Sequence, residues 1–128
     1  MARTQLSGWQ IPSIESSGKM KYIELSHSTV AHVANSIVVY RLNLPDDIDG
    51  INLKTIRVIS DENLSFVVRL MDGDTDMPIY ESLEEIKYQY DNVDIPYKPT
   101  ERAVFVEIHN KGTITTKYHI NLRGIEVK

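Results

Sequence analysis

Alternation of apolar and polar side chains with a period of two runs through most of the chain after residue 18. Residues 64–71 place Leu64, Phe66, Val68 and Leu70 on one face of an extended segment. Such alternation is typical of a β-strand with one face buried. The same reasoning predicts further strands at residues 20–25, 36–44, 51–59, 102–109 and 113–127.

Turn-forming residues separate these segments. Residues 45–50 (PDDIDG) and 60–63 (SDEN) are rich in Asp, Pro, Gly and Asn, which favour turns. Six to eight short strands spaced about ten residues apart are typical of a sandwich. The sequence therefore predicts an all-β protein with a single antiparallel, jelly-roll-like β-sandwich at residues 19–128.

The C-terminal third predicts a hairpin around Asn110-Lys111-Gly112. A three-residue loop that ends in glycine is a favoured hairpin geometry. The register that keeps the apolar residues on one face pairs Ile108 with Ile114, Val106 with Thr116, Val104 with Tyr118, His109 with Thr113 and His119 with Ala103. Gly124 is expected to mark a bulge or bend in the last strand.

Residues 81–99 are ambiguous. Ser82 and Glu85 resemble a helix capping box, whereas Tyr88 and Tyr90 suit an extended strand equally well. A helical turn or long loop is the favoured interpretation of residues 81–90. Residues 91–99 contain two prolines and are expected to form a loop.

Residues 1–18 show neither the two-residue alternation of a strand nor the 3.6-residue period of a helix. They are interpreted as an extended N-terminal arm. Four large apolar side chains interrupt its polar sequence: Leu6, Trp9, Ile11 and Ile14. A free tail would leave all four in water. The arm is therefore expected to be an interface segment, held on its own domain or on a neighbouring chain.

Composition narrows the function classes. The 128 residues include no cysteine, 14 basic and 18 acidic residues, and carry a formal charge of −4. The absence of cysteine excludes disulfides and thiolate chemistry and fits a reducing compartment. The charge disfavours nucleic-acid binding, and no signal peptide or membrane span is expected. Protein subunits are the expected partners, including copies of the chain itself.

Asp72, Asp74 and Asp76 are the candidate metal ligands, because alternating carboxylates can converge on calcium. The EF-hand pattern is absent, since Met77 and Leu83 occupy positions that need Gly and Glu. Solvated turn residues are the favoured interpretation, here and in the second acidic loop formed by Asp46, Asp47 and Asp49. No cofactor is therefore expected.

The four histidines do not show a metal-binding or catalytic spacing. His27 and His32 lie near serine and threonine hydroxyls, but no acid, nucleophile elbow or oxyanion turn accompanies them. The chain is thus expected not to be an enzyme.

Four tyrosines lie between the predicted strands: Tyr80, Tyr88, Tyr90 and Tyr97. Their rings suit a protein-contact or sugar-stacking surface. The alternative is that they cover an open edge of the sandwich and anchor the loop.

The arm Leu6-Ser7-Gly8-Trp9-Gln10-Ile11-Pro12-Ser13-Ile14, followed by a small cysteine-free sandwich, resembles the small structural proteins of tailed-phage virions, such as decoration, neck, tail and baseplate components. The resemblance implies symmetric assembly with exchanged arms, no chemistry, and a virion location after assembly in the host cytoplasm.

The alternative is a carbohydrate- or ligand-binding sandwich module assisted by calcium. The strand at residues 118–125 is broadly similar to those of discoidin-like and galactose-binding-like domains. In such modules an acidic loop often binds calcium and exposed aromatic rings bind sugar.

Overall fold

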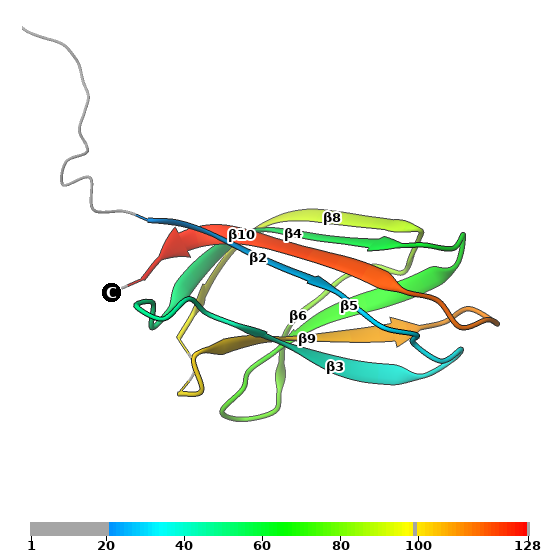
Figure 1. The fold of residues 1–128 in the computed structure, drawn as a ribbon, viewed down its shortest axis with the longest axis horizontal. Helices are drawn as coiled ribbons and strands as arrows, with labels where there is room; N and C mark the ends of the chain where they lie inside the picture. The colour runs from blue at the N-terminus through cyan, green and yellow to red at the C-terminus, as the bar shows by residue number, and fades with distance from the viewer. Residues whose placement is uncertain (1–20, 99, 128) are drawn as a thin grey trace, which may run out of the picture.

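A computed structural model describes residues 21–98 and 100–127. These residues form two antiparallel sheets packed face to face (Figure 1). The first sheet has the order β2-β10-β4-β8 and contains β2 (Tyr22–Ser28), β10 (Tyr118–Glu126), β4 (Ile51–Ser60) and β8 (Tyr88–Tyr97). The second has the order β3-β9-β5-β6 and contains β3 (Ile37–Asn43), β9 (Ala103–Asn110), β5 (Ser65–Met71) and β6 (Pro78–Glu81), with β7 (Glu85–Ile86) also paired to β5.

The all-β antiparallel sandwich predicted from the sequence is confirmed. Most successive strands switch from one sheet to the other. Within the described residues, no helix has the length and apolar character needed to cross a lipid bilayer.

The core fills the space between the two sheets. On β5 every second side chain points inward, and β4 alternates in the same way except at an irregularity after Leu53. Five side chains of these two strands are fully buried: Leu53, Val58, Phe66, Val68 and Leu70. Burying one such side chain contributes about 1.5–3 kcal/mol. Among the described residues, the buried core cluster runs from Ile23 to Leu122.

The predicted hairpin between residues 102 and 127 is wrong. β9 pairs with β3 and β5, whereas β10 pairs with β2 and β4 in the other sheet. Asn110 is buried, and its amide donates to the carbonyls of His32, Val33 and Ile114. These bonds hold the segment after β9 against the β2–β3 loop, and the chain then crosses to the first sheet.

The expected partners of these residues change accordingly. His109 lies opposite Ile37 and Val67, and His119 lies opposite Ser28 and Ile59. Val104, Val106 and Ile108 face the β3 residues Leu42, Tyr40 and Val38. The bulge expected at Gly124 is confirmed, since the β10–β4 register shifts between Arg123 and Gly124.

Residues 81–97 are mostly strand, contrary to the helical turn and loop expected there. Ser82 does not cap a helix. Its hydroxyl accepts a hydrogen bond from the Val68 backbone amide of β5 at 2.9 Å, in place of a backbone carbonyl of a neighbouring strand. β8 then runs along the edge of the first sheet, with Pro96 opposite Asn52. An edge strand tolerates proline because one side of its backbone pairs with no neighbour.

Candidate functional site

The four candidate tyrosines separate into two pairs. Tyr88 and Tyr90 project from the outer face of β8, each about half exposed, and their rings are parallel to within 2° at a centroid distance of 6.4 Å. Both line a shallow groove of about 280 Å³. On the outer face of the first sheet, Tyr88 lies opposite Ile59 of β4, and Tyr90 lies opposite Arg57.

Tyr80 and Tyr97 are structural anchors. The Tyr80 hydroxyl donates to Asp91, and burial together with this carboxylate raises the pKa of Tyr80 well above its usual range. The Tyr97 hydroxyl donates to the Met71 carbonyl, and burial raises its pKa. These two hydroxyl contacts tie the Tyr80 and Tyr97 side chains to the sandwich.

The aspartate loop serves as a hydrogen-bond acceptor. Asp72 accepts from the Asp74 amide at 2.9 Å, and the Asp74 carboxylate accepts from the Thr100 amide at 3.1 Å. Asp76 has a φ of 60°, which an aspartate in a turn adopts readily. Within the described ranges, no group of three or more His, Asp or Glu side chains could hold a metal ion. Calcium binding at this loop stays a prediction.

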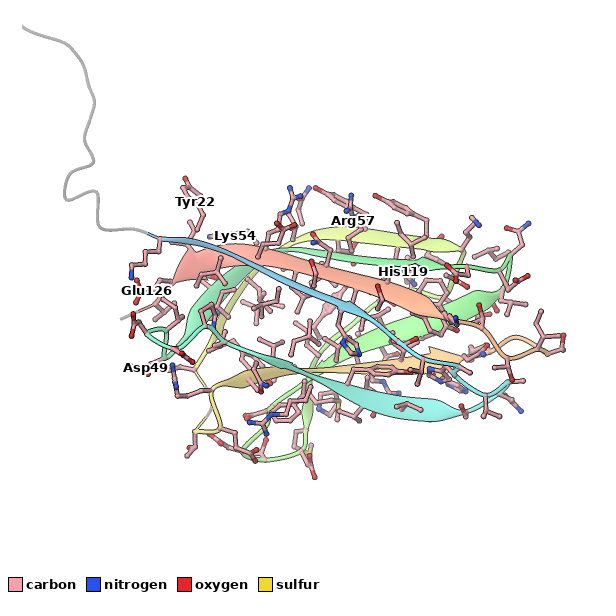
Figure 2. The ribbon with its side chains drawn as sticks, in the orientation of Figure 1. Tyr22, Asp49, Lys54, Arg57, His119 and Glu126 are labelled. Atoms are coloured by element: carbon pink, nitrogen blue, oxygen red, sulfur yellow. The ribbon has the colours of Figure 1, made fainter. Side chains whose placement is uncertain are left out.

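The two acidic loops lie at the same end of the sandwich as the start of β2. Arg102 joins the first loop, where its Nε lies 3.2 Å from Asp49. Two residues before it, Thr100 contacts Asp74 of the second loop. Figure 2 shows Asp49 at this end, below Tyr22, which projects away from the start of β2. We call this the acidic end.

The outer face of the first sheet carries a hydrogen-bonded polar network. Ser28 Oγ lies 2.9 Å from His119 Nδ1, and His119 Nε2 lies 2.6 Å from Asp61. These three residue types occur together in serine hydrolases. Here, however, Ser28 lies in a regular strand paired with His119 and not on a nucleophile elbow, and His119 and Asp61 are half exposed. The arrangement joins β2 to β10 across the sheet.

Glu24 forms the second part of this network. Its carboxylate accepts from Asn121 at 2.6 Å and from Arg123 at 3.2 Å, and these two contacts lower the pKa of Glu24. Sequence spacing alone did not reveal either cluster, because the partners lie at least 58 residues apart in the chain. The available signal in the sequence was that His119, Asn121 and Arg123 alternate with apolar residues in β10 and therefore share its outer face.

Exposed apolar side chains gather at the other end of the molecule, opposite the acidic end. Val30 and Val33 lie in the β2–β3 loop, Ile114 lies in the β9–β10 connection, and Ile37 begins β3. The buried Asn110 amide fixes two of these segments together, since Val33 and Ile114 both accept from it. We call these four residues the apolar end.

The apolar end continues along β3, the outer strand of the second sheet. Ile37, Val38 and Val39 are 55%, 36% and 49% exposed. This strand was predicted from the sequence, but its edge was not predicted to be a contact surface. The arm residues Leu6, Trp9, Ile11 and Ile14, which were singled out, lie outside the described residues.

No protein-family model and no curated protein matches the chain. Among solved structures, the chain is similar to the insecticidal delta-endotoxin Cry8Ea1 of Bacillus thuringiensis, with 14% identity and a TM-score of 0.42 over 77% of this chain. It spans only 19% of the endotoxin. A Bacillus endospore appendage described as a disulfide-linked pilus shows 10% identity and a TM-score of 0.47, over 91% of this chain and 99% of that one. Such distant likenesses carry no argument about function.

Proposed function

We propose that the protein is a non-enzymatic assembly subunit that binds copies of itself and other structural proteins through its arm and its sandwich. The observation that carries the proposal is the apolar end, where Val30, Val33, Ile37 and Ile114 are about half or more exposed. Clustered exposed apolar side chains usually mark a protein contact surface. A place in a virion, as a decoration, neck or tail component, is part of the same proposal and follows from the resemblance of the arm and the small sandwich.

The two ends of the molecule are chemically different, which supports assembly of a particular kind. One end holds the two aspartate loops, and the other end holds the exposed Val30, Val33, Ile37 and Ile114. Contacts between unlike surfaces are heterologous and build rings or filaments rather than closed dimers. We therefore favour head-to-tail stacking of subunits.

Deletion of residues 1–18 is the direct test of the arm's role. Because the core cluster of the described residues joins both sheets, the truncated chain is expected to fold with an unchanged melting temperature. Because it lacks four apolar contact residues, it is expected to sediment as a monomer where the full chain forms oligomers. Sedimentation velocity over a concentration series measures this. A truncated chain that assembles as well as the full chain contradicts the proposal.

Ligand binding is the second candidate, and the parallel, exposed rings of Tyr88 and Tyr90 are the observation that favours it. Aromatic faces of this kind stack on sugar rings. The expected result is that Tyr88→Ala abolishes binding to a glycan identified from an array, while Tyr22→Ala, an exposed tyrosine at the acidic end, leaves it intact. The array is probed with and without calcium, and Asp74→Ala tests the acidic loop. A chain that binds no glycan in either condition excludes this candidate.

A further inference from the structure

The edge of β3 is the least protected sheet edge among the described strands. Exposed edges are usually blocked by charges, proline or bulges, because their free backbone groups attract other strands. β8 carries Asp94 and Pro96, β6 carries Pro78 and Glu81, and β2 carries Glu24. β3 begins with Ile37-Val38-Val39-Tyr40 and reaches its first charge only at Arg41.

The hydrogen-bond phase of β3 shows which backbone groups are available. Ser36 accepts from the Asn110 amide at 3.0 Å, and the Leu44 amide donates to Arg102, so these directly opposite residues are hydrogen-bonded pairs. Hydrogen-bonded pairs alternate along an antiparallel ladder. The even-numbered residues of β3 therefore pair with β9. Ile37, Val39 and Arg41 direct their N–H and C=O groups to the free edge.

From this edge we infer that β3 receives residues 7–11 of the arm of a second copy as an added antiparallel strand. The inference rests on the proposed assembly role and names the surface that the arm binds. Strand addition to an exposed edge takes affinity from main-chain hydrogen bonds and specificity from alternate side chains.

The arm sequence fits this edge in one register. Opposing Ile11 to Ile37 places Trp9 opposite Val39 and Ser7 opposite Arg41, all on the outer face. Aromatic and β-branched residues opposite one another are a favourable cross-strand pair. Odd-numbered arm residues then direct their backbone groups toward β3.

Proline fits the same register. Pro12 falls opposite Ser36, just before the start of β3, and it belongs to the even-numbered positions that face away from the new pair. Its missing N–H therefore costs no hydrogen bond.

The direction of the chain favours a second copy, rather than the same chain, as the source of the arm that binds β3. The described chain enters β2 at the acidic end, whereas the first part of β3 lies toward the apolar end (Figure 1). An arm that turned back on its own domain would run parallel to β3. An arm from the next subunit in a head-to-tail stack runs antiparallel, the slightly more stable pairing. The eleven residue-to-residue steps from Ile11 to Tyr22 reach up to about 36 Å, enough to cross between subunits.

The experiment uses full-length variants. Val39→Lys places a charge on the edge, and Val39→Pro removes only an N–H that faces the free edge. Both are expected to be folded monomers by circular dichroism and sedimentation. Leu83→Lys, at a more exposed apolar position beside the opposite edge, is the control and is expected to assemble like the unmodified chain.

Mixing tests the exchange itself. The donor is Val39→Lys, which keeps its arm. The acceptor combines Trp9→Ala with Ile11→Ser and keeps its edge. Because Trp9 is the only tryptophan, emission from the mixture reports the donor arm alone. A complex of the two monomers with blue-shifted emission is the expected result.

The outcomes separate the inference from the proposed function. If the unmodified chain assembles and both Val39 variants assemble equally well, the arm binds elsewhere and the β3 inference is wrong, while the assembly role stands. If the mixture gives no complex although each partner is folded, exchange onto this edge is excluded. Blue-shifted emission from monomeric unmodified chain indicates docking on its own domain and also overturns the inference. An unmodified chain that stays monomeric at all concentrations contradicts the assembly role itself.

Discussion

A Gly124→Ala variant is expected to unfold with a free energy about 3 kcal/mol below that of the unmodified chain. The reason is the bulge between β10 and β4. A Cβ at Gly124 would lie 2.3 Å from the Asn52 carbonyl oxygen and 2.8 Å from the Ile51 side chain. The closest obstacle is backbone in a central ladder, so relief requires β4 to shift. Urea denaturation followed by circular dichroism measures the change.

Gly50→Ala is the matched control. Its Cβ would lie 3.0 Å from the Lys98 side chain, which can move aside, and 3.1 Å from the Tyr97 carbonyl. The expected loss is less than about 1 kcal/mol. Equal losses for the two variants would show that the close approach at the bulge is not what requires glycine at position 124.

The second large effect is expected at His32. This side chain is 1% exposed, and its ring bonds Tyr40 through Nδ1 at 2.7 Å and the Ser36 carbonyl through Nε2 at 3.0 Å. Its ring also packs edge-on against Tyr118 at 5.2 Å. His32→Ala removes both hydrogen bonds and leaves a cavity, so we expect a loss of about 3–4 kcal/mol in the free energy of unfolding.

His27→Ala provides the comparison, since His27 is exposed and only approaches Tyr40, at 5.7 Å between ring centroids. Its expected cost is within about 0.5 kcal/mol. The same denaturation assay applies to both variants. A small loss for His32→Ala would mean that the ring contacts seen here contribute little to the fold.

The sandwich class could be predicted because its central strands have unmistakable patterns. In β5, side chains alternate between core and outer face along the whole strand, and in β4 the alternation breaks only at Lys54 and Thr55. The turns on either side contain Asp, Asn, Gly or Pro. In β8 the pattern fails, because the inward position 89 is a glutamine. Its amide donates to the Phe66 and Leu83 carbonyls and the Ser82 hydroxyl, so a buried polar residue replaces the expected apolar one.

The C-terminal hairpin could not be resolved from local sequence. Asn110-Lys111-Gly112 is good turn chemistry, and the Gly112 amide does donate to the Asn110 side chain at 2.8 Å. The strands on either side nevertheless enter different sheets. β10 pairs between β2 and β4, and from this position it buries Tyr118 and Leu122 in the core. Tertiary burial decides the pairing, and a turn motif does not encode it.

The residue types of the candidate contact surface could be predicted from the sequence, but which of these side chains are exposed could not. The sequence groups Tyr80, Tyr88, Tyr90 and Tyr97 equally, and only the strand phase of β8 and the hydrogen bonds to Asp91 and Met71 separate surface rings from anchors. The Ser28–His119–Asp61 network was not predictable, since its members come from three distant segments.

The pairing of β2 with β10 has a consequence for how the chain folds during synthesis. β2 is an outer strand, and within its sheet it pairs only with β10, the last of the described strands (Figure 1). The first sheet therefore cannot be completed until β10 has left the ribosome. Contacts between such distant segments slow folding, and they make it a single late event rather than a sequence of independent steps. Any loss of the last strand removes the centre of the first sheet, so incomplete chains are excluded from the folded population.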